Sequence, residues 1–278
     1  MIAEPRPRRQ VLQKGLGKDS KAVSSPPQAD SQRLSKCVMA LKACSRTDAE
    51  KYIEGGWVSV AGQVVEEPMF RVTVQSVVID PQASLLELAS ITLLLHKPPG
   101  FDAMALPGEA NPRVKPARQL LTAASHAADD SSEIRLLRRH FAKLTAGVPL
   151  ETAASGLVVF TQDWRVARKL EEDAGTIEQE IIVEVAGPVE PPVLKRLNHG
   201  LASDGQALPP VKVSLNSTGD ASSKLRFAVK GTHPGLIAYL CERVGLEIIS
   251  MKRLRIGRVA MGPLPPGQWR YLQAHERF

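Results

Sequence analysis

Cysteine is scarce in this chain of 278 residues, which contains only Cys37, Cys44 and Cys241. Their number is odd and they form no Cys-x-x-Cys pair, so neither a disulfide framework nor a zinc knuckle is expected. Three unpaired thiols fit a reducing compartment best.

Long apolar runs are also missing. The sequence has no stretch of about 18 apolar residues, which a transmembrane helix requires. Its first residues lack the apolar centre of a signal peptide. Together with the free thiols, these absences predict a cytoplasmic protein without a membrane partner.

Recognisable cofactor motifs are absent as well. The six histidines show no metal-ligand spacing with cysteines or carboxylates. There is neither a Walker loop nor a Rossmann fingerprint, since Gly55-Gly56 is a helix stop rather than a phosphate cradle. We therefore expect no metal and no organic cofactor.

Positive charge is what the sequence does have, with a formal net charge of +7 and a pI of about 9.4. Residues 1–30 carry six basic residues against three acidic ones, and residues 224–278 carry ten against three. Such a balance favours an acidic partner such as nucleic acid. Residues 1–30 show no apolar periodicity, so they are predicted to be a disordered basic tail.

Two short helices and a hairpin are predicted next. Apolar residues at helical spacing begin with Leu34 and end with Leu41. A second helix begins at the cap Ser45-x-x-Asp48 and ends at Gly55-Gly56. Residues 57–65 then alternate as a hairpin, and residues 71–79 add a further strand.

This region resembles the S4 RNA-binding domain. The matching residues are Arg33-Leu34-Ser35-Lys36, Cys44-Ser45-Arg46, Ala49, Tyr52-Ile53, Gly56, Val58-Ser59-Val60 and Gly62. The resemblance implies phosphate contacts by Arg33, Lys36, Arg46 and Lys51. Without the motif, these residues would be read as ordinary solvated charges on helix faces.

A second resemblance begins at an apolar run, Ile91 to Leu95, that is followed by His96-Lys97-Pro98-Pro99-Gly100. It resembles the Leu-Asn-Lys-Pro-x-Gly strand of the ribosomal RNA pseudouridine synthases that carry an N-terminal S4 domain. His96 departs from that pattern. The resemblance places Lys97 among the expected RNA-binding residues, although a lysine at a strand end is usually just solvated.

The same family has its best-known signature around residues 147–163. An extended approach over Val148 to Glu151 precedes Ser155-Gly156 and a predicted buried strand from Leu157 to Thr161. Glu151 alone could be a solvated loop carboxylate. Aligned with the family's Gly-Arg-Leu-Asp, however, Glu151 meets the catalytic Asp, while Val148 and Pro149 replace the Gly and Arg.

Two further departures concern the expected cleft. On the strand predicted over residues 177–185, Ile181 stands where the family has a tyrosine that stacks on the target base, and Gln179 stands where it has a lysine. An aliphatic side chain can pack against a base but offers no π face. Residues 234–239 also depart from the family's basic helix start.

The C-terminal part matches again, at Lys252-Arg253-Leu254-Arg255-Ile256-Gly257. The resemblance makes this a closing strand and places Arg253 and Arg255 in a basic RNA-binding patch beside the cleft. The alternative for each arginine is a charge at a strand edge that prevents aggregation.

The expected fold class is α+β, with a small αα-ββ unit of S4 type followed by a larger mixed, mainly antiparallel sheet with flanking helices, the pseudouridine synthase fold. The predicted parts are a disordered basic tail (1–30), an S4-type RNA-binding domain (31–80), a linker (81–92) and a pseudouridine-synthase-like domain (93–278). Further predicted elements are helices over 133–144, 164–172 and 191–198 and a strand over 224–229.

Members of this family isomerise uridine in place without a cofactor, by flipping out the base and engaging the nucleoside with the catalytic carboxylate. Because Asp, Arg, Tyr and the basic helix start are all replaced here, we expect a monomeric RNA-binding protein, acting on structured RNA such as ribosomal RNA, with lost or impaired isomerisation. The alternative is an active, divergent pseudouridine synthase that uses Glu151.

Overall fold

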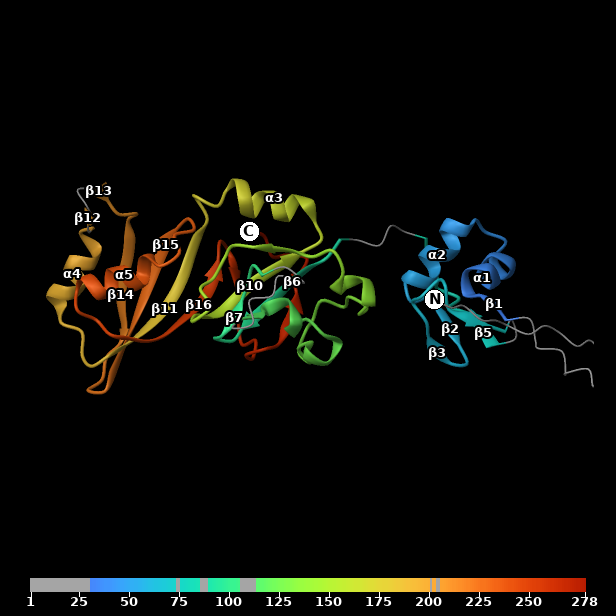
Figure 1. The fold of residues 1–278 in the computed structure, drawn as a ribbon, viewed down its shortest axis with the longest axis horizontal. Helices are drawn as coiled ribbons and strands as arrows, with labels where there is room; N and C mark the ends of the chain where they lie inside the picture. Colours follow the sequence, from blue (N-terminus) through green and yellow to red (C-terminus); the bar gives the residue numbers. More distant parts are fainter. Residues whose placement is uncertain (1–30, 74–75, 86–89, 106–113, 201, 204–205) are drawn as a thin grey trace, which may run out of the picture.

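The computed structural model describes residues 31–73, 76–85, 90–105, 114–200, 202–203 and 206–278. The basic tail predicted over residues 1–30 lies outside these residues, as does part of the predicted linker. Figure 1 shows a small N-terminal unit at one end of the molecule and helices α4 and α5 at the other.

The small unit contains the two predicted helices and the hairpin. Its elements are β1 (Gln32–Arg33), α1 (Leu34–Lys42), α2 (Arg46–Glu54), β2 (Val58–Val60), β3 (Gln63–Val64), β4 (Arg71–Val72) and β5 (Val77–Ile79). The Ser45 hydroxyl caps α2 by accepting a hydrogen bond from the Asp48 N–H, at 3.1 Å. Leu34, Val38 and Ile53 are fully buried between the helices and strands.

The single strand predicted over residues 71–79 was wrong. Its first part, β4, pairs with β1, whereas its last part, β5, pairs with β2. Between β4 and β5, the Ser76 N–H donates to the carbonyl of Thr73 at 3.2 Å. A bond between residues three apart does not occur within an extended strand, so one continuous strand does not form here.

The remainder of the chain is built on a nine-stranded sheet that confirms the α+β class. Its strands follow the order β14-β15-β11-β16-β10-β6-β18, with β17 beside β16 and β9 beside β10. The pairs are antiparallel except for β10 and β16, which run parallel.

The elements of this larger part are β6 (Thr92–Lys97), β7 (Phe101–Asp102), β8 (Lys115–Pro116), β9 (Thr145–Gly147), β10 (Ser155–Thr161), α3 (Trp164–Glu172), β11 (Glu178–Ala186), α4 (Pro191–Asn198), β12 (Ala202–Ser203), β13 (Gln206–Ala207), β14 (Val211–Ser217), β15 (Ser222–Lys230), α5 (Leu236–Arg243), β16 (Ile248–Ile256), β17 (Val259–Ala260) and β18 (Trp269–Tyr271). The predictions for α3, α4, β11 and β15 are confirmed to within about two residues at each end. The Asp163 carboxylate caps α3 by accepting a hydrogen bond from the Arg165 N–H at 2.8 Å.

The helix predicted over residues 133–144 was wrong. Only a 3-10 turn, Arg138–Phe141, forms within it. Glu133 and Lys143 have φ values of +58° and +50°, which no α-helix contains. The segment contacts the small unit instead: the Arg135 guanidinium lies over the Trp57 ring, 5.2 Å from its centroid, and the Arg138 N–H donates to the Glu66 carboxylate at 2.6 Å.

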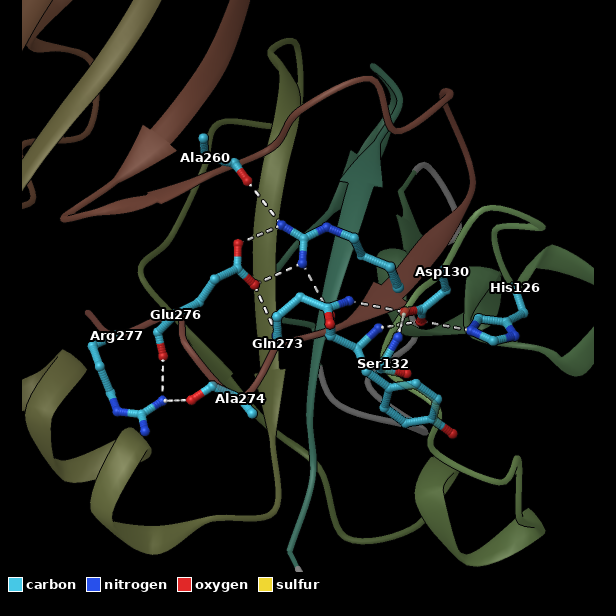
Figure 2. A network of polar contacts seen from close by, with 10 residues as sticks. His126, Asp130, Ser132, Ala260, Gln273, Ala274, Glu276 and Arg277 are labelled. Atoms are coloured by element: carbon cyan, nitrogen blue, oxygen red, sulfur yellow. Dashed lines mark hydrogen bonds and ion pairs between the residues drawn. The ribbon is translucent and has the colours of Figure 1, made fainter.

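A buried carboxylate anchors the last strand of the sheet. Asp130 accepts hydrogen bonds from the N–H groups of Ser132 and Tyr271, at 2.9 and 2.8 Å, and from the Gln273 amide at 3.1 Å. His126 lies 2.8 Å from the same carboxylate, as Figure 2 shows. These bonds hold β18 against the irregular segment that follows β8, so the network has a structural role.

The parallel pair of β10 and β16 brings two backbones unusually close at Gly156. This glycine pairs with Arg253 and has a φ of +116°. A Cβ atom at this position would lie 2.2 Å from the Arg253 carbonyl oxygen and 2.5 Å from its nitrogen. Only glycine therefore allows the two strands to pair in this register.

We expect Gly156→Ala to lower the free energy of unfolding by about 3 kcal/mol or more, because the backbone contact and the strained φ add. Gly187→Ala is the matched control, since Gly187 also has a positive φ, of +70°, but has open space around it. This control is expected to cost about 1 kcal/mol. Urea denaturation measures both, and equal losses would contradict the close approach at Gly156.

Candidate functional site

A cavity of about 170 Å³ opens where the loop before β10, strand β11 and the turn before α5 meet. The described residues that line it are Asp102, Met104, Pro149, Leu150, Glu151, Thr152, Gln179, Ile181, Val229, Gly231, Thr232, His233, Pro234, Leu236, Ile237 and Arg253. The structure therefore brings Glu151, Ile181 and Arg253, three of the predicted site residues, to one place.

Arg253 lies at the base of this cavity and is fully buried. Its guanidinium donates to the carbonyls of Val148, Pro149 and Leu157, at 3.0, 2.7 and 2.8 Å, and to the Gln179 side-chain oxygen at 2.8 Å. Burial lowers the pKa of this guanidinium to about 9, while the negative charge of Glu151 acts in the opposite direction. The arginine is therefore charged at neutral pH.

Glu151 lies shortly after Val148 and Pro149, two of the residues whose carbonyls accept hydrogen bonds from Arg253. It is partly exposed, and its carboxylate accepts a hydrogen bond from the Gly235 N–H at 3.1 Å. Gly235 is the residue before α5, so the carboxylate reaches from the loop before β10 to the turn before α5. The predicted catalytic carboxylate thus already has a partner within the protein.

Lys97 supports the loop on the other side of Glu151. Its ammonium is fully buried and donates to the carbonyls of Pro98, Thr152 and Ala154, at 3.1, 3.3 and 2.6 Å. Burial and, to a smaller extent, the charge of Arg253 lower the pKa of this amine to about 8, against the opposite effect of the Asp102 and Glu151 carboxylates. At neutral pH, two buried cations therefore flank the Glu151 loop.

Strand β11 forms the facing wall. Ile181 is 9% exposed and belongs to the apolar cluster under α4 and α5, together with Val229, Leu236 and Ile237. It provides an aliphatic surface at the place where an aromatic ring was expected from the family pattern. The wall opposite Glu151 is therefore formed by branched aliphatic side chains.

Gln179 is a site residue whose role sequence reasoning missed. Its amide nitrogen donates to the Gly231 carbonyl at 2.7 Å, and its oxygen accepts from Arg253. A signal was available, because the alternation of β11 places this glutamine on the buried face that also carries Ile181 and Val183. A buried polar residue on such a face needs hydrogen-bond partners.

Arg255 lies outside the cavity lining. Its guanidinium pairs with Glu178 at 2.7 Å and with Glu180 at 3.3 Å, on neighbouring β11. The structure thus gives Lys97, Arg253 and Arg255 partners within the protein, and the first two are sealed from solvent. For Lys97 and Arg253 the geometry favours a role in holding the Glu151 loop over direct phosphate contact, and RNA binding by all three residues stays a prediction.

The remaining predicted RNA-binding residues lie in the small unit, away from the cavity. Arg33, Lys36, Arg46 and Lys51 are all exposed on or beside α1 and α2. Arg46 pairs with Glu50 one turn along the helix, at 2.8 Å. Their solvent exposure leaves them accessible to a large polyanion, and their role also stays a prediction.

Within the described ranges, no group of three or more His, Cys, Asp or Glu side chains is arranged to hold a metal ion. No described helix is long and apolar enough to cross a membrane. The acidic and basic side chains among the described residues that line the cavity are those of Asp102, Glu151 and Arg253.

No protein-family model matches the chain. It is 26% identical over 247 residues to an uncharacterized RNA pseudouridine synthase of Aquifex aeolicus, covering 88% of this chain and 94% of the relative. It is 24% identical over 252 residues to the ribosomal large subunit pseudouridine synthase B of Bacillus subtilis, covering 88% and 93%.

A crystal structure of a pseudouridylate synthase superposes with a TM-score of 0.52 at 18% identity, over 87% of this chain and 96% of that chain. The resemblance to the RNA pseudouridine synthases is confirmed. Within this pseudouridine synthase fold, the cavity described above is the candidate active site. Among the residues that match the family pattern, Arg253 lines the cavity, whereas Lys97 and Gly156 support the backbone beside it.

The buried ammonium of Lys97 predicts a specific pH dependence of stability. Lysine has a pKa of 10.5 in the unfolded chain and about 8 here. Between these values the unfolded chain holds the proton and the folded chain does not, so the free energy of unfolding rises with pH, by at most about 3 kcal/mol.

We expect Lys97→Met to remove this contribution, so that its free energy of unfolding rises less between pH 8 and pH 10.5. Lys195→Met, which changes an exposed lysine of α4, should keep the rise. Urea denaturation at several pH values measures all three proteins. The same pH dependence in Lys97→Met and the unaltered chain would contradict the assignment.

Proposed function

We propose that the chain is an RNA-binding protein of the pseudouridine synthase type that has lost, or largely lost, the isomerisation of uridine. Its partner is structured RNA, with ribosomal RNA as the class. An S4-type domain over residues 31–80 and a monomeric state form part of the proposal. The observation that carries it is the engagement of Glu151 with the Gly235 N–H.

This contact bears on catalysis because of the length of the side chain. A glutamate extends one methylene further than the aspartate expected here, and it spans to the turn before α5. Catalytic groups that are misplaced by about 1 Å can lose roughly a hundredfold in rate. One carboxylate oxygen is also held at the turn before α5, which restricts the positions from which Glu151 can engage a nucleoside.

The apolar wall supports the same conclusion. Ile181 occupies the position of the base-stacking tyrosine and is packed into a buried cluster with Val229. A base that enters this cavity finds aliphatic contact there but no aromatic ring from β11. Two groups that the reaction needs, the short carboxylate and the stacking ring, are thus replaced on opposite walls.

RNA binding is supported by three independent observations. The relatives that the chain resembles are named RNA pseudouridine synthases. The net charge is +7. The small unit exposes Arg33, Lys36, Arg46 and Lys51 on two helices of the kind that the S4 resemblance predicts.

One observation favours the second candidate, an active, divergent pseudouridine synthase. Glu151 and Arg253 line the same cavity, and the two interact electrostatically. In this alternative, Glu151 releases the Gly235 N–H and itself engages the nucleoside.

Turnover separates the two candidates. Unmodified ribosomal RNA is incubated with the full chain, and pseudouridine is detected by carbodiimide labelling. We expect no conversion above that of Glu151→Ala, and RNA affinities of the two proteins that agree within about twofold. The Bacillus subtilis relative serves as a positive control. Conversion that Glu151→Ala abolishes would establish the enzyme and overturn the proposal.

A further inference from the structure

The turn between β15 and α5 crosses the mouth of the cavity. It runs from Gly231 to Gly235, which have φ values of +86° and +79°. Its first four residues, Gly231 to Pro234, line the cavity, and so does Leu236 after it, whereas Gly235 does not. In the sequence this segment was only a departure from the expected basic helix start.

Both ends of this 231–235 turn are tied to the site. The Gly231 carbonyl accepts from the Gln179 amide at 2.7 Å, and Gln179 in turn accepts from Arg253. The Gly235 N–H donates to Glu151 at 3.1 Å. The turn is therefore held in place by the same charged groups that form the base of the cavity.

His233 is the middle residue of the turn, and its imidazole is the only ring of aromatic type among the described residues that line the cavity. The side chain is exposed, and its Nε2 lies 3.1 Å from the Lys230 carbonyl oxygen. A Cβ atom on Gly231 would come within 2.9 Å of that nitrogen. Glycine at 231 thus makes room for the ring.

The lining around the ring suits a flat, unsaturated ligand. Ile181, Val229 and Leu236 supply a buried aliphatic surface, while Glu151 and Arg253 supply polar groups. Proteins that bind single-stranded RNA commonly stack bases on aromatic rings, including imidazole. The ring that β11 lacks at Ile181 is thus present on the neighbouring turn.

We propose that His233 is the base-stacking residue of this cavity, which binds a single unpaired pyrimidine nucleotide of RNA between the imidazole and the aliphatic wall. The inference rests on the proposed function and assigns the nucleotide contact to the 231–235 turn. It applies whether or not the nucleotide is isomerised.

The test measures the affinity of the full chain for a ten-nucleotide oligouridylate and for the same strand built from dihydrouridine. Dihydrouridine keeps the phosphates and carbonyls but has a saturated, non-aromatic base. We expect the unaltered chain to bind oligouridylate about 5- to 100-fold more tightly than the dihydrouridine strand, the range given by stacking of one base.

Three variants locate the effect. His233→Ala should lose the preference for uridine, and His233→Phe should keep it, because phenylalanine retains the ring without the nitrogens. His199→Ala is the matched control. His199 is also exposed with a ring nitrogen 2.9 Å from a backbone carbonyl, that of Lys195, but it caps the C-terminus of α4, outside the cavity lining. It should behave as the unaltered chain does.

The outcomes distinguish this inference from the proposed function. Failure of the unaltered chain to bind either strand or ribosomal RNA would overturn both. Binding to RNA with no preference for uridine, or with a preference that His233→Ala retains, would overturn the role of His233 and leave RNA binding intact. Loss of the preference in both His233→Ala and His233→Phe would also count against stacking.

Discussion

The buried guanidinium of Arg253 is the interaction on which the site depends. Removing such a charge from water costs several kcal/mol unless hydrogen bonds replace the lost solvation. Here three backbone carbonyls and the Gln179 side chain do so. Those carbonyls come from the approach to β10 and from β10 itself, so the path of the chain on either side of Glu151 is fixed by one side chain of β16. The close pairing at Gly156 places that side chain correctly.

The agreement with the pseudouridine synthase pattern and the departures from it fall on different parts of this arrangement. Lys97, Gly156 and Arg253 match the pattern, and each one sets the backbone of the Glu151 loop or its strand. Glu151 and Ile181 depart from it, and both face the cavity. The residues that support the site therefore differ from those that face its cavity, which fits a fold whose function lies in exchangeable side chains.

Local signals in the sequence were sufficient for most elements and for the location of the site. Helical spacing and caps identified α1, α2 and α3, and the family signature led to Glu151 and Ile181, which line one cavity. Contacts between distant segments were not accessible in this way. The partners of Gln179 and the position of the 231–235 turn depend on how β11, β15 and β16 pair. The failed helix over residues 133–144 likewise reflects contacts with the small unit that outweigh local propensity.

In the proposed function, the small unit and the cavity contact one RNA. Ultraviolet crosslinking of the full chain to ribosomal RNA, with the crosslinked peptides mapped by mass spectrometry, tests this directly. We expect crosslinks both within α1 and α2 and within the 231–235 turn. Crosslinks confined to surfaces remote from both, such as α4, or no crosslinks to ribosomal RNA would contradict it.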